Sequence, residues 1–286
     1  TCSPRRSKPD SRHAEAVTAA ARPAQTVAVC ARVDRNGLIA AECRSLTGGT
    51  ADEDGIADCD TIDLVARSAY VQKGLHVIAG AGSFDALVAA VAAKEFPADD
   101  FRIDLHDPSG RVGRSTQEVA TTLADVIPFG PDLRQPRHRF IVAASADRVL
   151  FGEVVAETDA SYRRHDSKPW TTSSSLDGRF ARALVNLVPT ARSVLDPCCG
   201  AGSIVLEAAA LGLEAHGVDW KPAMVGMTRE NLAHFGYAAT VVQADSRLHH
   251  QVADAIVADL PYGHAIEADE PTIRAILERG AELAPE

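Results

Sequence analysis

Two patterns of hydrophobic and polar positions follow one another along the chain, and they meet near residue 159. Before that point, short β-branched or alternating runs between Gly, Pro and Asn turns predict strands mixed with short helices. After residue 190, strands and helices alternate regularly, which is typical of a parallel α/β sheet. The predicted strands are 26–33, 74–79, 101–106, 139–144, 148–155, 193–195, 214–219, 239–242 and 254–258, and the predicted helices are 38–46, 61–70, 83–93, 115–127, 176–188, 204–211, 222–235 and 270–283.

This order of elements divides the chain into segments, because 286 residues exceed the length of a typical single domain. The first 25 residues lack periodicity and mix Pro, Ser, Arg and Ala, which predicts a flexible tail. The remainder is predicted to hold a ferredoxin-like α+β domain, a second small α+β domain, a polar linker and a Rossmann-like α/β domain. Their respective ranges are 26–95, 96–158, 159–178 and 179–286.

A glycine turn opens the predicted α/β domain. The strand at 193–195 runs into Asp196-Pro-Cys-Cys199-Gly200-Ala-Gly202, and a helix follows directly. Glycines in such a turn let a ligand approach the backbone near the positive end of the helix dipole. We therefore expect Asp196, Cys199, Gly200 and Gly202 to contact a cofactor.

The nature of that cofactor depends on the residues around the two glycines. A dinucleotide fold places glycines at the first, third and sixth positions, but Val205 occupies the sixth here. Asp196 at the strand end would also repel a pyrophosphate. A sulfonium ligand carries positive charge, so the pattern favours S-adenosylmethionine over a dinucleotide.

Two further acids end the next strands. Asp219 follows the glycines by about twenty residues, the spacing at which an acid accepts hydrogen bonds from ribose hydroxyls. Trp220 is then positioned to pack against adenine, and Asp245 with Ser246 to bind the adenine amino group. The alternative roles are a cap for the helix starting near Pro222 and, for Asp245, an ordinary turn.

The last predicted strand ends in Asp259-Leu260-Pro261-Tyr262. This tetrapeptide resembles the (Asp or Asn)-Pro-Pro-(Tyr or Phe) motif of methyltransferases that modify amino groups conjugated to a planar ring. Leu260 replaces the first Pro, as in THUMP-containing tRNA guanine-N2 methyltransferases. The resemblance implies that Asp259 and the Leu260 carbonyl accept the two amine hydrogens, Pro261 stiffens the turn and Tyr262 stacks on the base.

The region before the α/β domain also resembles that family. A strand, a helix, an Asp-Leu-x-x-Pro turn and two strands, the last with a central glycine, cover 96–158 in the order of a THUMP domain. A THUMP domain grips the acceptor end of tRNA, which makes tRNA the expected partner. The alternative is a small domain for dimerisation or substrate closure. The resemblance also implies a cofactor-contacting loop at 172–176, where Ser174 and Ser175 could bind the methionine carboxylate although the family's His-Pro-Ala-Pro-Leu pattern is missing.

Composition both limits and supports this hypothesis. The net charge of −10 argues against a large phosphate-binding surface. Six cysteines without C-x-x-C spacing predict reduced thiols of a cytoplasmic protein, with a Cys198–Cys199 disulfide as the alternative. We expect no membrane segment and no metal site, and we favour a monomer. Basic residues that are either an RNA track or a solvated face are Arg5, Arg6, Lys8, Arg12, Arg134, Arg137, His138, Arg139, Arg163, Arg164, His165, Lys168, Arg179 and Arg182.

The resemblance as a whole implies transfer of a methyl group from S-adenosylmethionine to the N2 amine of a guanine in tRNA. Two other hypotheses stay open. One is an N-methyltransferase for ribosomal RNA guanine, DNA adenine or a protein side chain, and the other is a non-catalytic RNA-binding protein. A class I methyltransferase sheet has seven strands, so further strands are expected after residue 286.

Overall fold

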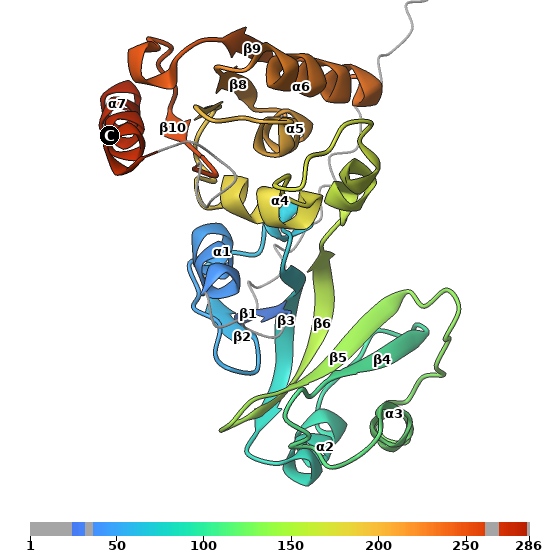
Figure 1. Ribbon diagram of the computed structural model, residues 1–286. Coiled ribbons are helices and arrows are strands. Elements are labelled where there is room, and N and C mark those ends of the chain that lie inside the picture. The colour runs from blue at the N-terminus through green and yellow to red at the C-terminus, as the bar shows by residue number, and fades with distance from the viewer. Residues whose placement is uncertain (1–24, 32–36, 261–268, 285–286) are drawn as a thin grey trace, which may run out of the picture.

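The computed structural model describes residues 25–31, 37–260 and 269–284, and two sheets organise them (Figure 1). The first sheet has six strands in the order β2-β1-β3-β6-β5-β4, and only β4 and β5 run parallel to each other. The expected tail at 1–25 lies outside the described residues except for Gln25. The elements of this region are β1 (Thr26–Cys30), α1 (Leu38–Thr47), β2 (Ile56–Cys59), η1 (Val65–Arg67), β3 (Val71–Ala81), α2 (Phe84–Ala92), β4 (Phe101–His106), α3 (Thr116–Ala124), β5 (His138–Ala144) and β6 (Val149–Glu157).

The long strands β3 and β6 pair with each other from Lys73 opposite Glu157 to Ala81 opposite Val149. They join the ranges 26–95 and 96–158 into one continuous sheet. The division of this sheet into a ferredoxin-like domain and a THUMP-like domain stays a prediction.

Helices α2 and α3 begin at the serines that the sequence pattern indicates. The Ser83 side chain accepts a hydrogen bond from Ala86 N at 3.3 Å. Ser115 forms a capping box with Glu118, in which each side chain accepts from the other residue's backbone N–H. Both helices pack on the sheet over a core that includes Phe140 and Phe151.

In this region one local prediction is wrong, and one strand was missed. The range 61–70 contains only the 3₁₀ turn η1, because the N–H groups of Ala69 and Tyr70 donate to the Glu42 carboxylate at 2.8 and 2.7 Å. Those donors would otherwise continue a helix. Strand β2 was not predicted, since it has four residues and is too short to show alternation.

The second sheet is fully parallel, with strand order β10-β7-β8-β9. Its strands and helices follow the succession predicted from the sequence. Because parallel strands point the same way, their carboxyl ends meet along one edge of the sheet. The elements are η2 (Ser161–Ser167), α4 (Gly178–Asn186), β7 (Ser193–Asp196), α5 (Ser203–Ala210), β8 (Glu214–Asp219), α6 (Pro222–Phe235), β9 (Thr240–Gln243), η3 (Ser246–Leu248), β10 (Ala255–Ile256) and α7 (Glu270–Leu283).

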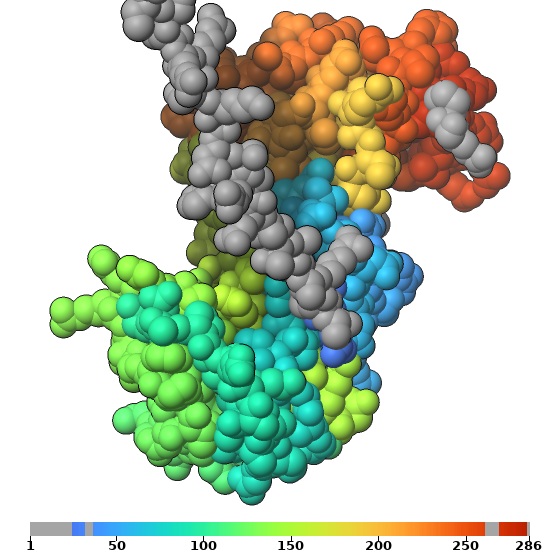
Figure 2. Space-filling view, turned by 180° about the vertical axis from the view of Figure 1, so that it is seen from behind, coloured from blue at the N-terminus to red at the C-terminus, as the bar shows by residue number. Residues whose placement is uncertain are grey.

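The connection between the two sheets is packed against both of them. Tyr162 and His165 of η2 are buried, and Tyr162 Oη donates to Ala69 O at 3.3 Å. The space-filling view shows α1, in blue, next to α4, in yellow, where the molecule narrows between its two broader ends (Figure 2). Within the described ranges, every helix is too short or too polar to cross a bilayer.

Candidate functional site

Three carboxylates lie together at the carboxyl ends of the parallel strands. Asp196 ends β7 and Asp219 ends β8, and they are 3% and 9% exposed. Asp259 follows β10 and is partly buried. Burial raises the pKa of Asp196 to about 8, and the negative charges of Asp259 and Asp219 act in the same direction. Burial also raises the pKa of Asp259.

The partners of these acids, among the described residues, are backbone N–H groups. Asp196 accepts from Cys198 N at 3.0 Å. Asp219 accepts from Gly200 N at 3.0 Å and from Lys221 N at 2.8 Å. No ion pair within the described ranges engages any of the three carboxylates. The edge of the sheet therefore holds negative charge that the described side chains leave uncompensated.

The glycine turn between β7 and α5 has the left-handed backbone that its two glycines permit. Gly200 has φ 52° and Gly202 has φ 85°. A Cβ on Gly202 would lie 2.5 Å from Thr228 Cγ2, so close packing on α6 requires this glycine. A Cβ on Gly200 would meet nothing within 4 Å. Gly200 thus faces open space beside the three acids.

Two polar residues of α6 hold the turn in place, and the sequence analysis missed both. Thr228 Oγ1 donates to Gly200 O at 2.7 Å, and Asn231 Nδ2 donates to Ala201 O at 2.9 Å. Both side chains are fully buried. Polar residues on the inner face of a predicted helix were the available signal, because buried polar groups need partners.

Asp219 ties the first two strand ends together through its bonds to Gly200 and Lys221. The N-cap residue of α6 is Lys221, and Asp219 accepts from its N–H at 2.8 Å. Asp219 therefore supports the start of the helix, and the ribose-binding role, which can coexist with this contact, stays a prediction. Trp220 beside it is 66% exposed, with Lys221 Nζ 5.2 Å from the ring centre.

The third strand end carries the residues predicted to bind adenine. Arg247 pairs with Asp245 at 2.6 Å, and this hydrogen-bonded contact lowers the pKa of Asp245. Ser246 Oγ donates to Pro197 O, which fastens the end of β9 to the glycine turn. A cavity of about 440 Å³ opens beside these residues, lined by Ala244, Asp245, Leu248, His249, His250 and Gln251.

Cys199 and Ser174, both predicted to contact the cofactor, lie in different surroundings. The Cys199 side chain is buried in the hydrophobic core of the α/β sheet, so only its backbone belongs to the turn surface. Ser174 is exposed and its hydroxyl lies 3.2 Å from Thr172 Oγ1. Its loop is nevertheless held at the start of α5, since Ser203 Oγ donates to Leu176 O at 2.8 Å.

The tetrapeptide predicted to be catalytic, 259–262, is described in part. Asp259 and Leu260 leave β10 at the same edge as Asp196, and both are partly buried. Pro261 and Tyr262 lie outside the described residues. The described ranges contain no group of three or more His, Cys, Asp or Glu side chains that could hold a metal ion.

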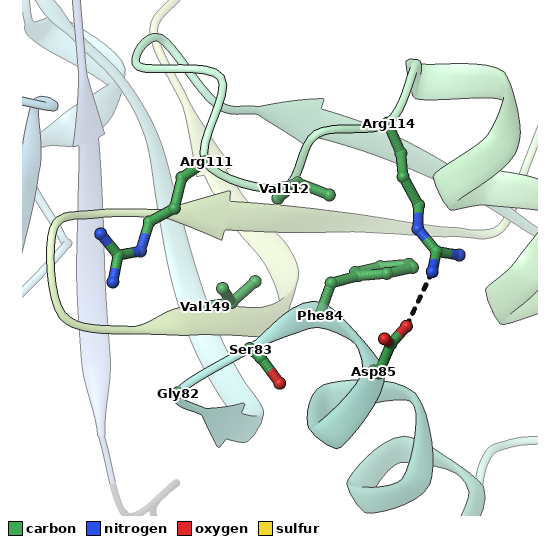
Figure 3. Close-up of a pocket in the computed structure, with 8 residues that line it drawn as sticks. All are labelled: Gly82, Ser83, Phe84, Asp85, Arg111, Val112, Arg114 and Val149. Atoms are coloured by element: carbon green, nitrogen blue, oxygen red, sulfur yellow. Dashed lines mark hydrogen bonds and ion pairs between the residues drawn. The ribbon is translucent and has the colours of Figure 1, made fainter.

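A second hollow lies on the six-stranded sheet, away from this edge (Figure 3). Its volume is about 390 Å³, and its lining residues come from the start of α2, the 111–114 loop and β6. Arg114 pairs there with Asp85 at 2.7 Å and lies over the Phe84 ring. This hollow shares no residue with the strand-end acids.

Comparisons with known proteins agree with this geometry. Residues 164–278 match the family model UPF0020, described as an RMKL-like methyltransferase domain. A tRNA (guanine(10)-N2)-dimethyltransferase of Methanothermobacter thermautotrophicus is 30% identical over 215 residues, which are 70% of this chain and 63% of that protein. The protein of the same name from Pyrococcus abyssi is 35% identical over 107 residues, covering 35% of this chain and 32% of that protein.

The fold has a solved counterpart. The crystal structure of TrmN from Thermus thermophilus superimposes with a TM-score of 0.50 and 20% identity, over 91% of this chain and 86% of that one. The second sheet and its helices therefore have the Rossmann-like fold of class I methyltransferases. The chain spans less than two thirds of the length of each of the two curated relatives.

Proposed function

We propose that this chain is an S-adenosylmethionine-dependent methyltransferase that modifies the exocyclic N2 amine of a guanine in tRNA. One observation carries the proposal. Asp196, Asp219 and Asp259 gather beside the open space at Gly200, and no described cation pairs with them. A ligand with a sulfonium and an ammonium group would supply the missing positive charge. The matched methyltransferase family and the names of the two relatives support the same reaction.

The residues at this edge fit that cofactor. The open position at Gly200 lets a ligand reach the backbone of the turn, where a larger side chain would intrude. Asp219 retains free lone pairs for ribose hydroxyls, and Trp220 offers an exposed ring for adenine. Asp245, Ser246 and Ser174 would complete the contacts. When bound, S-adenosylmethionine supplies an electrophilic methyl group.

The chain's own residues would orient the amine and handle its proton. An exocyclic amine is a poor nucleophile because its lone pair is delocalised into the ring. In our proposal Asp259 and the Leu260 carbonyl accept its two hydrogens, which turns the lone pair toward the methyl group. Asp259 also collects the proton, a role worth roughly 10²–10⁴-fold in rate. Pro261 and Tyr262 would stiffen the turn and stack on the extruded base.

The six-stranded sheet would bind the rest of the RNA. We propose a THUMP-like role for it, with tRNA as the partner and the protein acting as a monomer in the cytoplasm. Part of the predicted basic track is already paired, because Arg137 contacts Asp99 at 2.9 Å and Arg139 contacts Glu157 at 2.5 Å. Arg134 and Arg163 are exposed and remain available.

The test is a methylation assay with unmodified tRNA transcripts and methyl-labelled S-adenosylmethionine, followed by digestion to nucleosides. We expect label in N2-methylguanosine, at least about 100-fold less of it with Asp259→Ala, and cofactor affinity unchanged within a few fold in that variant. Label in adenosine, or only with ribosomal RNA or DNA, would replace the substrate. Cofactor binding without transfer to any nucleic acid would leave a non-catalytic RNA-binding protein.

A further inference from the structure

The cofactor helix α5 is connected to the six-stranded sheet by a network of polar and charged residues, most of them buried. We propose that these residues, Glu42, Arg67, His165, Arg182, Asn186 and Glu207, form a rigid joint that positions the RNA-binding sheet relative to the methyl-transfer site. The proposal rests on the proposed function, since it explains how one RNA could be held by the first sheet and modified at the second. It assigns a positioning role to Glu207 and Arg182, not a catalytic one.

Glu207 is the centre of the joint on the methyltransferase side. It lies on α5, one turn after Ser203, where the helix leaves the glycine turn. Arg182 Nε of α4 donates to Glu207 Oε2 at 2.7 Å, and His165 Nδ1 of η2 lies 2.5 Å from Glu207 Oε1. All three side chains are no more than 1% exposed. Both oxygens of a carboxylate on the cofactor helix are thus held from outside that helix.

Arg182 carries the connection across to the other sheet. Its Nη1 donates to Arg67 O at 3.2 Å, and its Nη2 donates to Ser161 Oγ at 3.3 Å. Arg67 belongs to η1, which leads directly into the long strand β3. A single guanidinium therefore contacts the cofactor helix, the connecting segment and the η1 turn that precedes strand β3 of the N-terminal sheet.

One turn further along α4, Asn186 makes a second crossing. Its Nδ2 donates to Glu42 Oε1 of α1 at 2.7 Å, and its Oδ1 accepts from Arg67 Nε at 2.9 Å. Glu42 in turn accepts from the backbone N–H groups of Ala69 and Tyr70. Figure 1 shows α4 between the two sheets, where both crossings begin.

The chemistry of the joint favours one fixed arrangement. Glu42, Glu207 and Arg182 are fully buried and Arg67 is partly buried, so two acids and two arginines balance in formal charge, although the only ion pair among these four residues is Arg182 with Glu207. Well-packed apolar residues usually stabilise such an interface as well as buried ion pairs do, because burial removes the hydration of each charge. Directional hydrogen bonds differ from apolar contacts in that a small rotation breaks several of them together. The charged residues therefore specify orientation.

Orientation matters because an RNA bound by the first sheet must present one base at Asp259. A rigid connection holds the target near the site at a high effective concentration, whereas a loose one spreads it over many positions. Loss of the joint should thus affect transfer within the fully bound complex. It should not affect the binding of either ligand alone.

The test compares two matched double variants of the full chain. Arg182→Met/Glu207→Gln removes the buried ion pair while keeping side-chain size and an acceptor for His165. Arg274→Met/Glu270→Gln makes the same substitutions in an exposed pair on α7, whose atoms lie 3.0 Å apart. Single-turnover transfer is measured at saturating tRNA and cofactor, together with the dissociation constant of each ligand and the modified position.

We expect the joint variant to transfer about 10–100-fold more slowly, to modify additional guanines, and to bind tRNA and cofactor within about threefold of the wild type. The α7 variant should match the wild type throughout. Glu207→Gln alone leaves the Arg182 charge buried without its carboxylate and should therefore transfer no faster than the double variant.

Unchanged transfer in a folded joint variant would overturn the proposal. A parallel loss of cofactor affinity would also overturn it, because the residues would then serve only to support α5. If the double variant does not fold by circular dichroism, Arg182→Lys is measured with the same readouts. If the wild type modifies no RNA, the proposed function fails, and the joint is tested separately by small-angle X-ray scattering. We expect a compact wild type and a broader distribution of interatomic distances in the joint variant. Identical scattering profiles would refute the joint.

Discussion

Two groups of buried carboxylates in this molecule differ in how their charge is balanced. Glu42 and Glu207, in the joint, are fully buried and accept hydrogen bonds from Asn186, Arg182 and backbone amides. The strand-end acids, which include Asp196 and Asp219, have only backbone N–H partners among the described residues. The contrast lies in Glu207, which pairs with the buried Arg182 cation, whereas the strand-end acids have no cationic partner among the described residues; Glu42 has neutral partners only.

The difference indicates what each group is for. A buried charge without a counterion is costly, and the protein responds by raising the pKa of the acid, as it does for Asp196. Such a group is stabilised when a cationic ligand arrives. A carboxylate that already has its cation gains nothing from a ligand and can only hold structure. The first arrangement suits a binding site and the second suits a joint.

Removing the carboxylate of the joint should give the largest change in stability. Glu207→Ala leaves Arg182 and His165 buried without their shared acceptor. We expect the free energy of unfolding to fall by about 3–5 kcal/mol, the usual result of breaking one side of a buried ion pair. Urea denaturation followed by circular dichroism measures this loss.

The control for this variant is the exposed acid Glu270, which pairs with Arg274 on α7. Glu270→Ala should change the unfolding free energy by no more than about 0.5 kcal/mol, since solvent screens exposed pairs. Equal effects of the two substitutions would mean that the joint is not an energetically distinct region.

Removing an acid at the strand ends should instead act mainly on the ligand. Asp219→Ala deletes the acceptor for two backbone N–H groups and, in our proposal, for the ribose. We expect cofactor binding to weaken by about 1–3 kcal/mol, the range for lost charge-assisted hydrogen bonds. Isothermal titration calorimetry gives the affinity directly.

Asp254 provides a matched control for Asp219. It also accepts from two backbone N–H groups, those of Arg192 and Ser193, at 2.8 and 3.1 Å. It precedes β10 and therefore lies at the opposite end of the sheet. Asp254→Ala should leave cofactor affinity unchanged. A similar loss in both variants would assign Asp219 to the fold and remove it from the cofactor site.

The two groups of carboxylates also differ in how far the sequence predicts them. The strand-end site was predictable because each of its parts is local: a strand, a turn with glycines and an acid lie within a few residues of one another. Convergence of Asp196, Asp219 and Asp259 then follows from parallel strands, whose carboxyl ends share one edge. The sequence pattern thus leads to this edge without knowledge of any tertiary contact.

The joint could not be found in this way. Glu42 and Asn186 bond across 144 residues of sequence, and Arg182 and Glu207 across 25. No period or motif links them, and Arg182 is indistinguishable in sequence from a basic surface residue. A contact between residues distant in sequence also explains why the helix predicted at 61–70 is wrong. The Glu42 carboxylate accepts hydrogen bonds from the N–H groups of Ala69 and Tyr70, which lie 27 and 28 residues later.

The smallest expected effect is a dependence on pH that only the strand-end acids should show. Burial raises the pKa of Asp196 from its ordinary value of 3.8 to about 8. Between these values the ligand-free folded protein holds a proton that the unfolded chain has lost, so the free energy of unfolding should decrease as pH rises toward 8. A cationic ligand prefers the ionised acid, so cofactor affinity should change in the opposite direction and increase.

We expect cofactor affinity to rise by at most about tenfold per pH unit between about pH 6 and 7.5, measured by calorimetry in buffers of equal ionic strength. Asp196→Asn should remove the slope because the amide does not titrate. Asp245→Asn should keep it, since the contact with Arg247 already lowers the pKa of Asp245 and that group stays ionised throughout. A wild-type affinity that is flat or falls over this range would mean that Asp196 does not receive a cationic ligand, and its contrast with Glu207 would lose its functional meaning.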